Sequence, residues 1–281
     1  MTGSYDSNTE GGVLRKNTGP LDDEVDVDNT GVFTFTETSD SIIKFLSLLR
    51  PWGYRLGTGT YIGGGDSDDC NFQLTDIPDG RCNSWGNPIS EIFAETIRYL
   101  AGLNPNPVFD ADDTAFLDGL NDTDWVDPLN IDENLCSDLN TIVINASVSS
   151  FDDDNTALTD VDGGINGNTI PAPGNITDVW TDTVGAAEGI NGNDFFVGIG
   201  SADNNEFCTS KRVDALSDAM GLCPEAPTVN GSFSMAGIAH YAHNNDIRPN
   251  LRVTKRLIRS QLRSQLMCLL SVYQELIRTM F

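Results

Sequence analysis

The sequence has few basic side chains. Its 281 residues include 16 Lys and Arg against 42 Asp and Glu, a formal charge of −26. Nucleic-acid phosphates and anionic membrane surfaces would repel such a chain, so neither is an expected partner. The charge favours calcium, cationic partners or simple solubility in salt.

Long apolar runs and familiar catalytic motifs are also absent. No stretch of 18 apolar residues occurs, so we predict no integral membrane segment. The polar N-terminus has no apolar signal region, which taken literally indicates a cytoplasmic protein. G-x-S-x-G, Walker A, G-x-G-x-x-G and H-E-x-x-H motifs are missing. We therefore expect no enzyme; the alternatives are a secreted metal-dependent hydrolase using the Asp-rich loops, or a non-functional gene fragment.

The six cysteines contain no C-x-x-C pair, which argues against a zinc ribbon. Two pairs, Cys70 with Cys82 and Cys208 with Cys223, lie close in sequence within loops rich in Gly, Asp, Asn and Pro. Loops without a core gain most from a covalent link, so we predict both disulfides and hence an oxidising compartment. Cys136 and Cys268 have no partner in this scheme.

Hydrophobic periodicity predicts a mixed α/β chain with long acidic loops. The apolar run 139–145 is typical of a central strand covered on both faces, 195–199 reads as a second buried strand, and 31–36 as a third strand. Helical spacing predicts helices over 39–49, 88–103, 180–187, 211–221 and 234–244, with Asn87 capping the second. Alternating strands and helices favour a three-layer domain around a mainly parallel sheet.

The best match to a calcium loop is residues 26–37. Asp26, Asp28 and Thr30 occupy its first, third and fifth positions, Gly31 supplies the turn, and Glu37 stands at the twelfth. The alternative is an Asn-Thr-Gly turn leading into a strand, since no entering helix precedes it.

Other groups of possible metal ligands favour simpler interpretations. Acid clusters at 66–69, 110–113 and 152–154 read as solvated loop charge before calcium. His240 and His243 are separated by three residues, and two ligands alone are too few for a metal site, which favours a structural role.

Six stretches, in this order, resemble one family. They are GGVLRKNTG at 11–19, NPISEIFAETIRYLAG at 87–102, LNTIVINASVSSFDDD at 139–154, GINGNDFFVGIG at 189–200, GLCPEAP at 221–227 and MAGIAHYAHNNDIRPNL at 235–251. Together they resemble the PilC/PilY proteins associated with type IV pili, over residues 11–251.

The resemblance implies a von Willebrand factor A-like region, followed in the family by a β-propeller that this chain does not reach, so both ends are expected to be incomplete. It implies a secreted protein at the cell surface, outer membrane or pilus tip, acting in pilus assembly, adhesion and twitching motility. The implied partners are pilus components such as minor pilins, or host and surface receptors.

The same resemblance bears on metal binding. A von Willebrand factor A fold usually holds a divalent cation through an Asp-x-Ser-x-Ser motif, a Thr and an Asp. Here the motif is absent, the Thr position falls on Asn87, and the Asp position falls on Asn145-Ala146-Ser147. Because alanine cannot coordinate a metal, we expect no intact site of this kind.

The last residues differ in charge from the rest. Residues 251–281 hold six basic residues and one acid, whereas the preceding 250 have a net charge of −31. We therefore divide the chain into a domain over 1–251 and a basic tail over 252–281, and predict that the tail is out of frame and buries little. The alternative is a genuine amphipathic helix, with Leu257, Leu262, Leu266, Leu269 and Leu270 at partly helical spacing.

Overall fold

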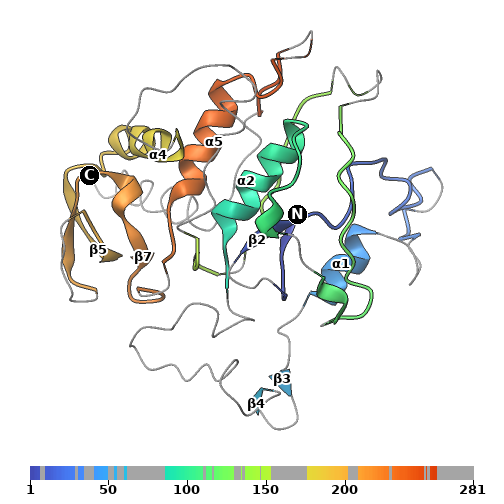
Figure 1. The fold of residues 1–281 in the computed structure, drawn as a ribbon, viewed down its shortest axis with the longest axis horizontal. Helices are drawn as coiled ribbons and strands as arrows, with labels where there is room; N and C mark the ends of the chain where they lie inside the picture. Colours follow the sequence, from blue (N-terminus) through green and yellow to red (C-terminus); the bar gives the residue numbers. More distant parts are fainter. Residues whose placement is uncertain are drawn as a thin grey trace.

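Figure 1 draws the computed structural model of the chain. The structure describes residues 1–6, 10–28, 31–34, 41–49, 54–55, 60–61, 86–109, 112–115, 117–129, 134, 137–145, 147–152, 176–201, 208–227, 230–249, 251 and 254–257. The other residues, among them Cys70, Cys82, Thr30 and Glu37, lie outside the described part, so the predictions made for them stay predictions. No helix in the described part is both long and apolar enough to cross a bilayer.

Three helices form the centre of the molecule. Helix α5 (Ser234–Asn244) packs between α2 (Ile89–Leu100) and α4 (Ile176–Ala187), as Figure 1 shows. Phe93 and Ile97 of α2 meet Ile238 and Tyr241 of α5 in the largest buried cluster. The predictions of helices in 88–103, 180–187 and 234–244 are confirmed, the last with its exact bounds.

Helix α2 follows from its sequence except at its first turn. Phe93, Ile97 and Leu100 recur at helical spacing and are buried. The helix ends before Gly102, whose φ of +70° suits glycine. The prediction that Asn87 caps it is wrong, because Pro88 takes the cap position without a side-chain cap bond.

Helices α4 and α5 approach closely at Gly237. A Cβ atom there would lie 2.2 Å from Thr181 Oγ1 and 2.5 Å from the Thr181 nitrogen. Trp180 packs its ring 5.0 Å from the ring of His240, farther along the same interface. A residue without a side chain therefore sets how near the two helices come.

Every ladder in the described part is antiparallel. β1 (Thr2–Gly3) pairs with β2 (Gly11–Val13), β3 (Tyr54–Arg55) pairs with β4 (Thr60–Tyr61), and β5 (Asn193–Ile199) lies between β6 (Ser210–Val213) and β7 (Met220–Leu222). The mainly parallel sheet that we expected is thus not found among these ladders. The three-layer, von Willebrand factor A-like class stays a prediction.

Residues 211–221 do not form the predicted helix. They form part of β6, the short 3-10 helix η4 (Leu216–Asp218) and β7. Lys211 and Val213 alternate with exposed neighbours, and the buried Lys211 ammonium donates to the Val197 carbonyl at 3.1 Å. Pairing of β6 with β5 determines that this segment is a strand. The spacing of apolar residues within 211–221 does not contain this information, because the partner strand lies elsewhere in the sequence.

The strand predicted at 195–199 is confirmed within β5, but the prediction that it is buried is wrong. Phe196 is 66% exposed and Ile199 is 47% exposed.

The prediction that residues 139–145 form a central strand covered on both faces is also wrong. Leu139 makes a single parallel bridge with Leu257, and 140–145 belong to no described strand. Ile142 and Ile144 are 87% and 81% exposed, so the segment is not covered on both faces.

A smaller hydrophobic cluster, separate from the one between the central helices, forms around helix α1. Helix α1 (Ile42–Leu48) begins at the cap residue Ser41, whose hydroxyl accepts from the Lys44 nitrogen. Glu24 also accepts from the first backbone nitrogens of this helix, at Ile42 and Ile43. Phe45 packs on the loop that follows the 3-10 helices η1 (Pro107–Phe109) and η2 (Asp113–Ala115). The helix predicted in 39–49 is confirmed.

The start of the basic tail is packed, contrary to our expectation for 252 onward. Lys255 is 4% exposed and its ammonium donates to the Ser137 carbonyl at 2.6 Å. Leu257 is 3% exposed, and its nitrogen donates to the Ala242 carbonyl. Residues 258–281 lie outside the described part, so their origin stays a prediction.

Candidate functional site

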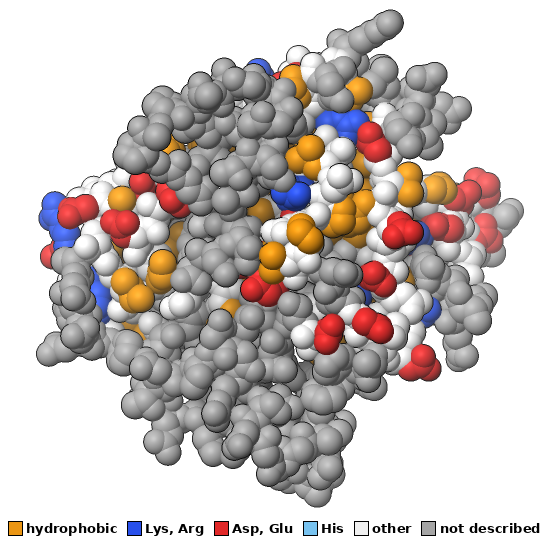
Figure 2. Space-filling view, viewed as in Figure 1, with side chains coloured by type: hydrophobic (Ala, Val, Ile, Leu, Met, Phe, Trp, Pro, Cys, Tyr) orange, Lys and Arg blue, Asp and Glu red, His pale blue; other side chains and the backbone are white. Residues whose placement is uncertain are grey.

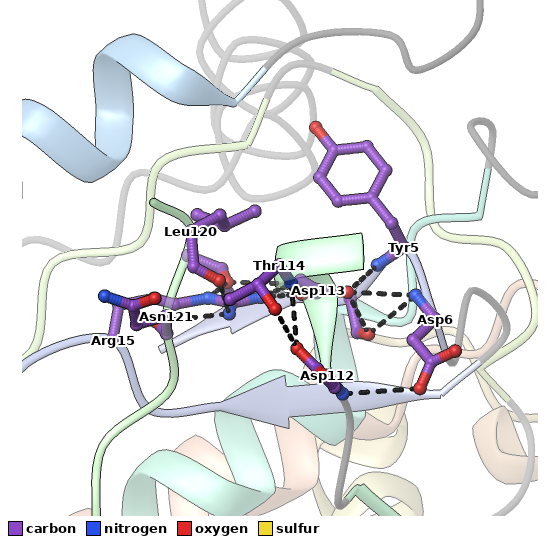
Figure 3. A network of polar contacts seen from close by, with 11 residues as sticks. Tyr5, Asp6, Arg15, Asp112, Asp113, Thr114, Leu120 and Asn121 are labelled. Atoms are coloured by element: carbon purple, nitrogen blue, oxygen red, sulfur yellow. Dashed lines mark hydrogen bonds and ion pairs between the residues drawn. The ribbon is translucent and has the colours of Figure 1, made fainter. Parts of the chain in front are cut away.

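A buried carboxylate, Asp113, organises the first of two polar centres. It opens η2, and its side chain is fully shielded from solvent. One oxygen accepts from the Ser4 hydroxyl at 2.8 Å and from the backbone nitrogens of Tyr5 and Asp6 at 2.7 and 2.9 Å. The other oxygen forms an ion pair with Arg15 (Figure 3). The anion thus has four donors and no need of a metal.

Arg15 supplies the opposite charge and is itself bound on several sides. It follows β2 and is 4% exposed. Its guanidinium donates to Thr2 Oγ1 and to the carbonyls of Gly3, Leu120 and Asn121. The pair therefore joins three distant stretches of chain, and a buried pair satisfied in this way holds segments in register.

The acid cluster at 110–113 is consequently not simply solvated charge. Asp113 is internal, whereas Asp112 is exposed and accepts from the nitrogen and hydroxyl of Thr114 (Figure 3). These two bonds lower the pKa of Asp112. Asp110 lies outside the described residues.

The second polar centre is Asp152 at the start of α2. One of its oxygens accepts from the Ser90 and Glu91 nitrogens at 2.8 and 3.3 Å, and the other accepts from the Ser232 hydroxyl at 3.3 Å. Ser90 Oγ in turn accepts from the Met235 nitrogen in the first turn of α5. One side chain thereby satisfies the free nitrogens of α2 and ties them to the entry of α5.

Burial acts on the ionisation of this centre. Asp152 is fully buried, and desolvation raises its pKa to about 8 while its four hydrogen-bond contacts pull the pKa down. Glu91 beside it is also fully buried and accepts from the Gly11 nitrogen at 2.9 Å. One turn further along α2, burial raises the pKa of Glu95 to about 7. Burial therefore holds the pKa values of Asp152 and Glu95 well above that of an ordinary carboxyl group.

Neither polar centre was evident from the sequence. Asp152 is the first residue of an Asp-Asp-Asp run, and such runs usually face solvent. Arg15 was the better signal, since it directly follows the apolar residues Val13 and Leu14. No pattern in the sequence identifies Asp113 as its partner 98 residues away.

Asn87, at the Thr position of the family resemblance, meets Asn145, which directly precedes the Asp position at Ala146; Ala146 itself lies outside the described residues. The Asn87 side-chain nitrogen donates to Asn145 Oδ1 at 3.0 Å and to the Ser147 and Val148 carbonyls. The Asn87 backbone also pairs with Ser150. The residue at the Thr position is thus bonded to the amide and carbonyl oxygens of the segment around the Asp position.

The predicted calcium loop is only partly described. The Gly31 nitrogen donates to the Asp26 carbonyl, the Asp26 nitrogen donates to the Val32 carbonyl, and Val25 bridges Phe33. This is the pairing of a hairpin with Gly31 at φ +66°, as the turn interpretation expects. The described part contributes the carboxylates of Asp26 and Asp28, whereas calcium takes six to eight oxygens. Calcium binding here stays a prediction.

The remaining predicted site residues that the structure describes make contacts within the fold. Cys208 and Cys223 form a disulfide with their Cα atoms 5.3 Å apart, which confirms that pair. His243 Nδ1 donates to the Leu257 carbonyl at 2.9 Å, while His240 lies against Trp180, so each histidine has its own structural contact.

Within the described part of the chain, no three His, Cys, Asp or Glu side chains converge as a metal site would require. The buried charges instead stabilise helix ends and chain crossings. A third example is Arg248, which donates to both oxygens of Asp127 and to the Leu100 carbonyl at the end of α2.

Comparison with known proteins gives one consistent result. A family model described as "PilY1 homolog, second domain" matches residues 1–242. A protein of Xylella fastidiosa (strain Temecula1) named "Type IV pilus biogenesis factor PilY1 homolog" is 28% identical over 264 residues. The match covers 87% of this chain and 17% of that relative, so the chain spans about a sixth of its length. No solved structure matches.

Proposed function

The chain belongs to the family of PilY1 homologues, where it corresponds to the second domain, and we propose that it is a non-catalytic domain of a type IV pilus protein at the cell surface. In this proposal it acts in pilus assembly, adhesion and twitching motility. Its partners are pilus components, minor pilins among them, or receptors on a host or another surface. The observation that carries the proposal is the family match over residues 1–242.

Two structural features support the proposal. The buried ionisable groups Asp113, Arg15, Asp152 and Arg248 each bind backbone or an opposite charge within the domain, which is a structural use. The Cys208–Cys223 disulfide suits an exported protein, because such bonds persist in oxidising compartments.

The surface charge suggests how a partner is bound. Figure 2 shows acidic side chains outnumbering basic ones on one described face. With a formal charge of −26, the chain would attract partner surfaces that carry Lys and Arg and would repel other acidic surfaces.

A von Willebrand factor A-like fold without its usual metal site is part of the proposal. The contact between Asn87 and Asn145 supports it, since the residue at the Thr position lies beside the residue that precedes the Asp position.

Complementation tests the proposal. A type IV-piliated bacterium lacking the parent gene would receive either the full gene or the gene without the segment for residues 1–257. We expect the shortened form to be exported, as shown by immunoblot of the surface fraction, yet to restore fewer surface pili and a smaller twitching zone. Equal piliation and motility from both genes would reject an assembly role for this domain.

A further inference from the structure

The segment 139–145 has two different faces. Leu139 is buried, and Thr141 and Val143 are partly buried, with Val143 packed against the main core. The alternate side chains Asn140, Ile142 and Ile144 are exposed, and we call them the outward face. Its two isoleucines are the most exposed large apolar side chains in the described part, where the next value is 66%. Adjacent apolar groups this exposed are typical of a surface that something covers.

The chain itself leads to this face. Leu257 bridges Leu139 in parallel, so the two chain segments run in the same direction. Leu257 is fixed by bonds to the Ala242 carbonyl and from His243, and Lys255 is held by Asp246 and Ser137. If the chain continued beyond Leu257 in this direction, it would run alongside 141–145, near Ile142 and Ile144.

The sequence that follows has the composition to cover the face. Residues 258–281, the C-terminal segment, have apolar side chains three or four positions apart: Ile258, Leu262, Leu266, Leu269, Tyr273, Leu276 and Met280. That spacing makes one apolar stripe on a helix. The segment has three basic residues and one acid, a charge of +2, whereas residues 1–257 have 13 basic and 41 acidic residues, a charge of −28. Opposite charge favours docking of the segment on the domain.

Length is sufficient as well. The distance from Leu139 to Ile144 along an extended chain is about 17 Å. A helix of 24 residues is about 36 Å long, so even half of the segment would reach along the whole face.

We propose that the outward face is the docking site of the C-terminal segment of the same chain, whose apolar stripe covers Ile142 and Ile144. This opposes our expectation that the tail buries little. It is also independent of the pilus role.

Hydrogen exchange on the full chain tests the proposal. Peptides from 258–281 should be protected in the wild type at least tenfold beyond an unstructured chain. The variant Ile142→Ser/Ile144→Ser should lose that protection. Val126→Ser is the matched control, since it removes another exposed apolar side chain (51% exposed) and should leave the protection unchanged.

Several results would overturn the proposal: exchange of 258–281 at the unstructured rate, as for a foreign tail, or protection that survives the double substitution. Protection of 139–145 that rises with protein concentration would assign the face to a second copy instead.

Cys268 gives a second measurement that does not depend on the serine variant folding. Under mild oxidation Ile142→Cys should yield a disulfide with Cys268 in peptide maps, and Val126→Cys should not; failure of the first or success of the second contradicts the docking.

Discussion

At the scale of single residues, the sequence identifies apolar core positions more readily than buried charges. Ile97 and Ile238 are fully buried and lie on stripes that helical spacing reveals. Asp113 and Asp152 are just as inaccessible, yet they lie in acid-rich stretches where most carboxylates face water. The burial of a charge depends on partners far away in the sequence, which a local pattern does not contain.

The ion pair between Arg15 and Asp113 yields the first residue-scale prediction. Replacing Arg15 with Ala leaves a buried carboxylate without its cation, so we expect a loss of roughly 3–5 kcal/mol in the free energy of unfolding. Urea denaturation of the full chain measures it. Asp112→Asn is the matched control, because the neighbouring carboxylate is exposed and should be dispensable. Equal midpoints for Arg15→Ala and wild type would show that the pair is not a structural tie.

The raised pKa of Asp152 predicts a dependence of stability on pH. Its folded pKa of about 8 exceeds its ordinary value of 3.8, so the folded state binds the proton more tightly. The contribution is therefore present below about pH 4 and is lost as pH rises toward 8. Glu95, with a pKa of about 7, acts in the same direction over a lower range.

Measurement of the free energy of unfolding from pH 5 to pH 8.5 checks this dependence. We expect it to fall with pH in the wild type and to fall less in Asp152→Asn, whose amide oxygen can still accept from α2 and whose nitrogen can donate to Ser232. Glu95→Gln should separately reduce the fall in the free energy of unfolding over the lower part of this pH range. A slope that Asp152→Asn leaves unchanged would show that Asp152 does not titrate in this range.

At the scale of elements, four of the five predicted helices form, whereas among the described residues only the predicted strand 195–199 is confirmed. Helices α1, α2, α4 and α5 have local periodicity, and their bounds lie within four residues of those predicted. Residues 139–145 and 211–221 were misassigned, because an apolar run does not reveal whether its outer face has a covering layer, and because Lys211 is an unusual residue for the buried side of a strand.

The crossing of α4 and α5 yields an element-scale prediction. In an isolated helix Gly→Ala stabilises by about 1 kcal/mol. In Gly237→Ala the new methyl group would lie within 2.5 Å of the Thr181 nitrogen and must push the helices apart. We expect overpacking to outweigh propensity and to give a net loss of about 1–2 kcal/mol.

Thermal unfolding by circular dichroism measures the effect of Gly237→Ala. Adding Thr181→Ala removes the hydroxyl at 2.2 Å but not the backbone contact, so it should restore only part of the stability. A more stable Gly237→Ala would show that the helices have room to spare.

At the scale of the whole molecule, composition describes the net charge but does not identify internal contacts. The charge of −26 argues for an acidic exterior, and a chain with this charge is destabilised by self-repulsion when folded. The family was recognisable because six stretches occur in one order, which no single motif conveys. The arrangement of the helices beside an antiparallel sheet was not recognisable, because long-range pairings decide it.

Calcium distinguishes a general effect of the acidic surface from a specific site. Screening alone should raise the melting temperature of the full chain equally in NaCl and in CaCl₂ at matched ionic strength. If residues 26–37 bind calcium, millimolar CaCl₂ should raise it further, and calorimetry should show a binding heat that Asp26→Ala abolishes. Asp22→Ala is the matched control, since it removes a nearby exposed carboxylate outside the predicted loop.

We expect the extra stabilisation by calcium to disappear in Asp26→Ala and to persist in Asp22→Ala. Equal melting temperatures in the two salts would leave the segment as a hairpin turn, and a calcium effect retained in Asp26→Ala would assign the ion to another cluster of the acidic surface.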